Sequence, residues 1–278
     1  MRLYRIITLL LIALMFLHTT NPAVAGNHAN KSGNTVTIEN SSITMQLTGG
    51  GNVPKYTFWD HDDNDSKYHV QFSHVFEAND NDDDGKYSHQ GDRKVSNSDV
   101  ALSSLSWDFS EISETNDGVD FNISSVGGDF SITFVNHIGN DASSLKFDVI
   151  VDGYTWTDDS AMFVIGFKLI AQGGDNDDDE NQDNEEQDGN QVTWGEGGFI
   201  DVEATAATAD GDIDVGVSTG NDGNSPLVYI SYGHFNNGFE HDPTIGVQAS
   251  ASGSFIPLNP VIIPFSLFIV VLIYRKKN

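Results

Sequence analysis

The segment from Asp80 to Asp92 carries oxygen-bearing side chains at the spacing of a calcium-binding loop. Asp80, Asp82 and Asp84 occupy alternate positions and Gly85 follows at the sixth, as in the first half of the D-x-[DN]-x-[DN]-G pattern. Ca²⁺ takes six to eight oxygen ligands, so a tight loop that turns several carboxylates inward suits it. The spacing therefore predicts a Ca²⁺ site.

The rest of the loop departs from the full pattern. The residue after the glycine, Lys86, is predicted to offer its backbone carbonyl, and Ser88 falls at position 9, which is often bridged by water. Position 12, where a glutamate would complete the shell, is Gly91, and the acid arrives one residue later as Asp92. We therefore expect weak binding, with a Kd of roughly 10⁻⁴ to 10⁻³ M. A solvated acidic turn without an ion is the alternative.

Other residues offer less specific chemistry. The nine histidines lack the spacing of a helical zinc motif, and we interpret them as surface or turn residues. No nucleophile elbow, phosphate-binding loop or dinucleotide fingerprint occurs, so the sequence indicates no catalytic residue. Paired carboxylates for glycan hydrolysis are too abundant to choose among. Four tryptophans are expected either as buried anchors or as a sugar-stacking platform: Trp59, Trp107, Trp156 and Trp194.

The charge of the chain limits its partners. The 278 residues carry a formal net charge of −28, and five of the 13 basic residues lie near the two ends. Nucleic-acid binding is excluded because phosphate recognition needs a cationic face. Such acidity fits cation binding or a saline habitat. Cysteine is absent, so an exported domain must be held by its core and, as we expect, by metal.

Both ends resemble targeting or membrane segments. Arg2 and Arg5 precede an apolar run and a small-residue site before Gly26, which predicts a signal peptide over residues 1–25. Residues 254–274 are long and apolar enough to span a bilayer, and the basic tail 275–278 fits the cytoplasmic side. The alternative is a sorting tail that is removed. The chain is therefore predicted to be a single-pass cell-surface protein with its N-terminal domain outside.

The region between these ends predicts an all-β fold. Short runs alternate between apolar and polar residues and are separated by clusters of Gly, Asn, Asp and Ser, as in an antiparallel β-sandwich. One such run is Tyr68 to Phe76, where every second residue, His74 included, is expected on one face. We expect one domain over residues 26–253, with a flexible start from Gly26 to Asn34 and a disordered acidic loop at 173–190. A boundary between two smaller β-domains at this loop is the alternative.

Four N-x-[ST] sequons mark expected surface positions. In an exported protein they predict glycosylation at Asn30, Asn40, Asn64 and Asn122.

The chain resembles archaeal single-span surface proteins that lack an assigned activity. The resemblance lies in the segments Phe72 to Asp92, Phe130 to Trp156 and Tyr229 to Val247, between the signal and the tail. It implies an extracellular β-domain and no catalytic residues. We expect a membrane-anchored, calcium-binding domain with a structural, adhesive or surface-assembly role, whose partners are surface glycans or neighbouring surface proteins. A tethered carbohydrate-binding module or glycan hydrolase is the alternative.

Overall fold

The computed structural model describes residues 28–49, 53–61, 65–172, 186–195, 197–222 and 225–248, and the described strands all lie in one compact unit that ends at Gln248. The predicted signal peptide, transmembrane segment and basic tail lie outside the described residues, as do positions 173–185 of the predicted acidic loop. Within the described ranges, no helix is long and apolar enough to cross a membrane.

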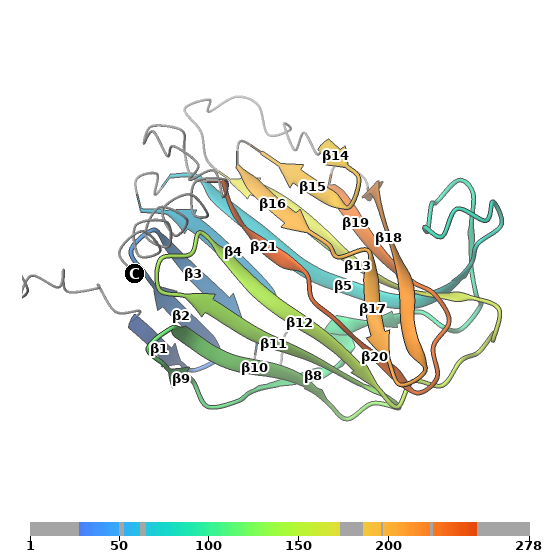
Figure 1. Cartoon of the computed structure of the whole chain (residues 1–278), viewed down its shortest axis with the longest axis horizontal. Coiled ribbons are helices and arrows are strands. Elements are labelled where there is room, and N and C mark those ends of the chain that lie inside the picture. Colours follow the sequence, from blue (N-terminus) through green and yellow to red (C-terminus); the bar gives the residue numbers. More distant parts are fainter. Residues whose placement is uncertain are drawn as a thin grey trace, which may run out of the picture. The chain divides into compact units, whose positions relative to one another are not determined.

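Strands account for the regular structure, apart from one short 3₁₀ turn at Leu102–Ser104. Every strand pairing given for the described residues is antiparallel (Figure 1). Alternating apolar residues produce this result because successive side chains of a strand point to opposite faces. The predicted all-β, antiparallel fold class is confirmed for this part of the chain.

The first layer is a sheet built around the long strands β5 and β13. From one edge to the other it runs β1 (His28–Ser32), β2 (Thr35–Glu39), β3 (Ile43–Thr48), β4 (Lys55–Asp60), β5 (Lys67–Asn79), β13 (Met162–Gln172), β19 (Ser225–Tyr232) and β18 (Gly211–Asp222). The short strands β6 (Arg93–Lys94) and β7 (Val100–Ala101) also pair with β5.

The second layer is centred on β12 (Figure 1). One side of β12 carries β11, β10, β8 and β9, and the other side divides into two branches. The strands are β8 (Ser106–Phe109), β9 (Ser113–Glu114), β10 (Gly118–Val126), β11 (Ser131–Gly139) and β12 (Ser144–Asp152), then β20 (Gly238–His241) with β17 (Thr205–Thr208), and β21 (Thr244–Val247) with β16 (Gly198–Asp201), β15 (Gln191–Trp194) and β14 (Glu186–Asp188).

Strand β18 belongs to both layers. Its first residues, from Gly211 to Asp214, pair with β17 of the second layer. From Val215 onward it pairs with β19 of the first layer. The strand therefore joins the layers along one side.

The main core lies between the two layers and is rich in aromatic side chains. The rings of Phe72 and Phe134, one from each layer, have centroids 4.3 Å apart. Tyr56 is fully buried and donates its hydroxyl hydrogen to Asn136 Oδ1 at 2.7 Å, again across the layers. Burial raises the pKa of Tyr56 well above its ordinary value. The Tyr56–Asn136 hydrogen bond, together with the one that Asn136 Nδ2 donates to the Phe134 carbonyl, offsets the desolvation cost of burying these polar groups in the core.

A β-bulge interrupts strand β5. Phe72 pairs with Phe167, whereas His74 pairs with Gly166, so Ser73 is an additional residue on β5. An added residue shifts the side-chain alternation by one position. The uninterrupted alternation expected from Tyr68 to Phe76 is therefore wrong after residue 72.

The bulge moves Phe76 to the outer face and a carboxylate to the inner face. Phe76 packs in a second apolar cluster with Val164 and Tyr229, outside the main core. Glu77 is fully buried. Its carboxylate accepts hydrogen bonds from Tyr154 Oη at 3.0 Å and from two backbone N–H groups, those of residues 157 and 158. Glu77 thus fixes the connection between β12 and β13, since both of its carboxylate oxygens accept hydrogen bonds from that connection.

Two segments expected as irregular structure contain strands. His28–Ser32, within the expected flexible start, forms β1 on the edge of the first layer. Glu186–Asp188, at the end of the expected acidic loop, forms β14 and pairs with β15. Both strands are mostly polar because they lie at sheet edges, where backbone hydrogen bonds form with little burial of side chains; in β1, Ala29 packs against the main core.

Candidate functional site

The loop between β5 and β6 folds around its first carboxylate. Asp80 accepts the backbone N–H of Asp84 at 3.2 Å and that of Gly85 at 2.8 Å. Asp84 in turn accepts the N–H of Lys86 at 2.8 Å. Asp83 and Gly85 both adopt the left-handed conformation, with φ of 58° and 74°. These two residues produce the tight turn that the D-x-D-x-D-G spacing predicts.

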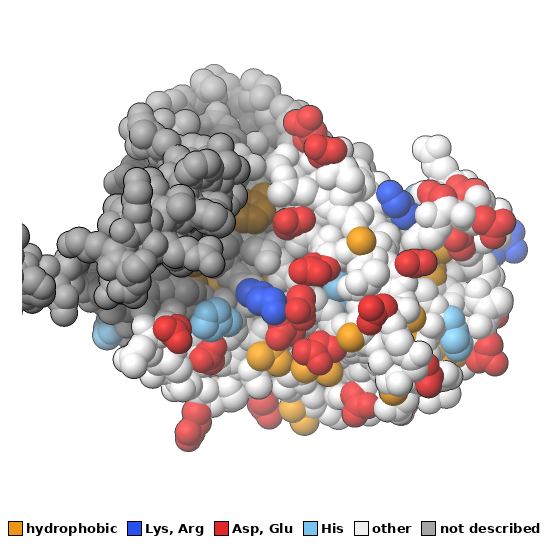
Figure 2. Space-filling model, in the orientation of Figure 1, with side chains coloured by type: hydrophobic (Ala, Val, Ile, Leu, Met, Phe, Trp, Pro, Cys, Tyr) orange, Lys and Arg blue, Asp and Glu red, His pale blue; other side chains and the backbone are white. Residues whose placement is uncertain are grey.

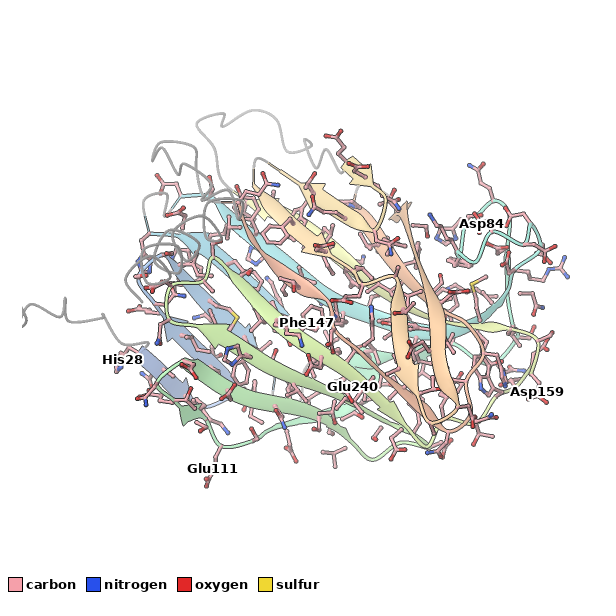
Figure 3. All side chains as sticks on the ribbon, viewed as in Figure 1. His28, Asp84, Glu111, Phe147, Asp159 and Glu240 are labelled. Carbon is pink, nitrogen blue, oxygen red and sulfur yellow. The ribbon has the colours of Figure 1, made fainter. Side chains whose placement is uncertain are left out.

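The turn brings three of the predicted ligands together. Carboxylate oxygens of Asp80, Asp82 and Asp84 lie within 4.8 Å of one another, and Figure 3 shows Asp84 on the projecting loop. No lysine or arginine of the described residues forms an ion pair with any of them. Partial desolvation and the charges of Asp84, Asp92 and Asp80 raise the pKa of Asp82. The group has the oxygen ligands and the negative charge of a metal site.

Asp92 and Ser88 close the loop by hydrogen bonds. Asp92 accepts the N–H of Asn81 at 2.9 Å through one oxygen and that of Ser88 at 2.7 Å through the other. Ser88 Oγ accepts the N–H of Gly91 at 2.9 Å. A Cβ atom at Gly91 would lie 2.7 Å from both Asp82 Oδ2 and Ser88 Oγ. Position 12 is therefore glycine because the loop leaves no room for a side chain there.

The predicted ligands thus divide into two sets. Asp80, Asp82 and Asp84 are brought together, with the Ser88 hydroxyl beside Asp82. Asp92 is not a member of this three-carboxylate group, since both of its oxygens hold the loop backbone. The predicted role of the Lys86 carbonyl stays a prediction.

A buried tyrosine fastens the loop to the outer face of the first layer. Tyr87 is 2% exposed, and its ring centroid lies 4.9 Å from that of Phe76 and 4.9 Å from that of Tyr229. Its N–H donates to Ser231 Oγ at 2.9 Å, and Ser218 Oγ donates to its carbonyl oxygen. The spacing of the loop residues did not predict this anchor. The signal for it was a large aromatic residue inside an otherwise polar loop.

A second acidic group, which sequence spacing does not reveal, lies on the outer face of the second layer. Asp148, Glu240 and Asp242 have carboxylate oxygens within 4.8 Å of one another. Lys146 Nζ lies 3.3 Å from Asp148 Oδ1 and 3.0 Å from Asp242 Oδ2. Figure 2 shows acidic side chains over the region of β12 and β20 with basic atoms among them, and Figure 3 labels Glu240 there.

The charges of this second group are partly balanced. Burial and the charge of Asp242 raise the pKa of Asp148, while Lys146 lowers it. The hydrogen bond to Asp242 and the charge of Asp148 raise the pKa of Lys146. This group therefore already contains a cation, whereas the loop group does not.

A hollow of about 300 Å³ lies on the outer face of the first layer beside the loop. It combines basic, hydroxyl and apolar groups, and its lining residues are Ser73, His74, Phe76, His89, Lys94, Gly166, Lys168, Leu227 and Tyr229. None of these is acidic. Such a mixture of apolar surface and a few polar groups is typical of small-ligand sites.

The tryptophans do not form one platform. Trp107 and Trp194 are buried in the main core, as anchors of the fold. Trp156 is half-buried, stacks on His234 with centroids 4.6 Å apart and donates its Nε1–H to a backbone carbonyl. Trp59 is half-buried on β4 with Lys67 Nζ 5.1 Å from its ring centroid.

The sequon asparagines differ in exposure. Asn30 is exposed and Asn122 is half-buried, while Asn64 lies outside the described residues. Asn40 is 6% exposed, and its Nδ2 donates to the carbonyl oxygens of Gly139 and Ala142. The fold therefore does not place Asn40 at the surface position expected for it, because its amide is used to join the two layers.

Two histidines also lie inside the fold rather than on the surface. His241 is 1% exposed and donates its Nε2–H to the Glu203 carbonyl at 2.9 Å, so its Nδ1 accepts the Tyr232 hydroxyl at 3.0 Å. His69 is 5% exposed with Nδ1 2.9 Å from Thr57 Oγ1. Burial lowers the pKa of both side chains. The surface interpretation is wrong for these two.

Comparisons with known proteins give matches only among solved structures. No protein-family model matches the chain, and no curated protein matches it. An alpha-mannosidase from Enterococcus faecalis aligns over 80% of this chain and 30% of its own, with 10% identity and a TM-score of 0.46. The heparan sulfate lyase HepC from Pedobacter heparinus aligns over 82% of this chain and 36% of its own, with 9% identity and a TM-score of 0.42.

A heparinase III is similar to the same extent. It aligns over 81% of this chain and 35% of its own, with 7% identity and a TM-score of 0.39. The chain thus spans about a third of the length of the structures it matches.

Proposed function

We propose that this protein is an extracellular β-domain stabilised by Ca²⁺ at the 80–92 loop, with a structural or adhesive role at a cell surface. The observation that supports it best is the group of three carboxylates, Asp80, Asp82 and Asp84, held within 4.8 Å without an ion-pair partner among the described residues. Like charges in this arrangement repel one another, and a divalent cation removes the repulsion.

Calcium binding is coupled to the fold through the loop anchor. Tyr87 connects the loop to β18 and β19 through Ser218 and Ser231. An ion that binds the folded loop and not the unfolded chain stabilises the fold by mass action. For a Kd of roughly 10⁻⁴ to 10⁻³ M, 10 mM Ca²⁺ contributes about 1.4 to 2.7 kcal/mol.

The surface role follows from the charge and from the predicted ends of the chain. A chain with 41 acidic and 13 basic residues repels its own copies unless divalent ions bridge them. The predicted signal peptide and C-terminal span would hold this surface outside the cell as a single-pass protein. Neighbouring surface proteins and surface glycans are the partners that this arrangement suits.

The test is thermal unfolding of the full chain in mild detergent, with 10 mM Ca²⁺ and with a chelator. The double variant Asp82→Ala, Asp84→Ala removes two oxygen ligands, and Asp108→Ala, Asp212→Ala is the control because it removes the same charge at exposed positions elsewhere. We expect Tm to rise with Ca²⁺ by about 3 to 10 °C in the wild type and in the control. An equal rise in the ligand variant would refute the site.

A second candidate function is a carbohydrate-binding module, and the hollow beside the loop supports it. The hollow offers hydroxyl, imidazole and ammonium groups together with apolar surface. Glycan hydrolysis needs a pair of carboxylates that face one cleft. The described lining of this hollow has none, so binding is favoured over hydrolysis.

A further inference from the structure

The hollow on the first layer gathers positive charge on a strongly acidic protein. Lys94 and Lys168, from β6 and β13, line it, and so do His74 and His89. Lys94 also pairs with Asp99, with Nζ and Oδ2 3.2 Å apart, so part of its charge is balanced at the rim. A local excess of cationic groups where the remaining surface is acidic selects an anion by charge complementarity.

The missing side chain of Gly166 leaves room for the Tyr229 ring, which lines the hollow. Gly166 lies in the middle of β13, paired with His74 on one side and with Tyr229 on the other. A Cβ atom there would lie 3.3 Å from Tyr229 Cε1. A glycine inside a strand often marks a place where another molecule approaches closely. The volume of about 300 Å³ is at the lower end for ligand pockets and suits a group the size of one sugar.

The polar groups around this space are held in position by one another. His89 Nε2 lies 2.6 Å from Tyr229 Oη, and its Nδ1 lies 3.1 Å from Tyr87 Oη. His74 Nδ1 lies 2.6 Å from Ser73 Oγ. Side chains that are already oriented lose less conformational entropy when a ligand binds.

We propose that this hollow binds a carboxylate-bearing sugar, a uronic acid, through Lys94 and Lys168. The ammonium groups pair with the carboxylate, the ring hydroxyls bond to the imidazole and hydroxyl groups, and the apolar ring face lies over Gly166 and beside Phe76 and Leu227. The inference rests on the second proposed function, carbohydrate binding, and defines its ligand as an acidic glycan.

The calcium loop forms one wall of the same hollow. His89 belongs to the loop, and Tyr87 anchors both the loop and His89. An ion that fixes the loop therefore also fixes His89. We expect chelation to weaken uronate binding about two- to fivefold without abolishing it, because Lys94 and Lys168 lie outside the loop.

The experiment is titration calorimetry of the full chain in mild detergent with D-glucuronate, D-glucose and inorganic sulfate. We expect glucuronate to bind with a Kd of about 1 mM, and glucose and sulfate at least tenfold more weakly. Sulfate has the charge without the ring, and glucose has the ring without the charge. Equal binding of glucuronate and glucose, or of glucuronate and sulfate, would overturn the proposal.

Substitutions in the lining test whether glucuronate binds in this hollow. Lys94→Gln and Lys168→Gln should each weaken glucuronate binding about fivefold, and Gly166→Val should abolish it by filling the space. Lys67→Gln is the matched control and should change Kd less than twofold, since Lys67 lies on the same sheet and its ammonium lies over the Trp59 ring, as that of Lys94 lies 3.9 Å from the Phe76 ring centroid. Unchanged affinity in both lysine variants and in Gly166→Val would place the ligand elsewhere and refute the hollow.

The calcium proposal and the uronate proposal can be refuted independently of each other. If Ca²⁺ leaves Tm unchanged but glucuronate binds in a manner that depends on Lys168, the calcium function is wrong and the uronate site stands. If Ca²⁺ raises Tm but no variant affects glucuronate binding, the calcium function stands and the uronate site is wrong.

Discussion

Two groups of three carboxylates lie on different scaffolds in this protein. Asp80, Asp82 and Asp84 belong to one loop, are close in sequence and lack an ion-pair partner among the described residues. Asp148 lies on β12, Glu240 on β20 (Figure 3) and Asp242 in the connection between β20 and β21, and Lys146 forms ion pairs with both aspartates.

The difference shows that closeness of carboxylates does not by itself define a metal site. On the strands, a lysine supplies the cation permanently, so the group is stable without an ion. In the loop, backbone N–H groups of Asp84 and Gly85 hold Asp80 in place but leave the net charge unchanged. The loop group is therefore the one that gains most from Ca²⁺.

The largest effect is expected from Tyr87→Ala, which removes the loop anchor. Loss of a buried aromatic ring costs about 3 kcal/mol, and the freed loop should also lose its Ca²⁺ response. Thermal unfolding with and without Ca²⁺ measures both. Tyr87→Phe keeps the ring and is the control, with a loss of about 1 kcal/mol and a retained Ca²⁺ response. A full Ca²⁺ response in Tyr87→Ala would show that the loop forms its site without the anchor.

Mild acid should destabilise β20, the strand that carries Glu240 and His241, at a higher pH than it destabilises the 80–92 loop. The pKa of His241 is lowered by burial, so the unfolded chain binds its proton more readily than the folded one. The contribution of His241 to the free energy of unfolding is therefore fully present above pH 6.5. It falls as the pH drops below this value, by at most about 1.4 kcal/mol per pH unit for one group.

Denaturant unfolding between pH 7.5 and 5 tests this slope, with His241→Gln as the comparison. His69 has a pKa lowered in the same way, so the variant should flatten the slope in part. A slope that is unchanged in His241→Gln would remove this histidine from the explanation.

The variant Lys146→Met tests whether the lysine ammonium explains the difference between the two carboxylate groups. Loss of the half-exposed ion pairs should cost about 0.5 to 1 kcal/mol at pH 7. The pKa of Asp148, already raised, should rise further, so the loss should become smaller as the pH falls and this carboxyl takes up its proton. The variant should also acquire a second Ca²⁺-dependent rise in Tm. Lys31→Met is a control with a similar change of charge, and a second rise there would contradict the explanation.

The smallest effect is expected from Asp82→Asn in the presence of a chelator. Because partial desolvation and nearby charges raise the pKa of Asp82, its ionised form opposes the folded loop, and the neutral amide removes this penalty. Tm should therefore rise slightly without Ca²⁺ and respond less to Ca²⁺. A lower Tm in chelator would show that Asp82 supports the empty loop by hydrogen bonding instead.

Local patterns predicted most of the strands and the loop. Val36 and Ile38, or Tyr56 and Phe58, face the core because a two-residue period is a property of the strand itself. The D-x-D-x-D-G spacing likewise brings Asp80, Asp82 and Asp84 together through contacts within six residues. Such features need no information from distant parts of the chain.

Other features depend on residues far away in the sequence. The bulge at Ser73 and His74 follows from pairing with β13, and it reverses the faces of Phe76 and Glu77. Asn40 begins a sequon, which predicts a surface position. It is buried because carbonyl groups about one hundred residues away accept hydrogen bonds from its side-chain amide. Neither β13 nor these carbonyl groups can be inferred from the spacing of the residues around Ser73 or Asn40.

The antiparallel β class, the acidic character and the spacing of three carboxylates can be predicted from the sequence, because each depends on neighbouring residues or on composition. Tertiary structure alone decided that Tyr87 anchors the loop, that Lys146 lies among the second carboxylates, and that a cationic hollow forms around Gly166. These features need strands that are distant in the chain to pair in one register, and the free energy of that pairing comes from the whole core.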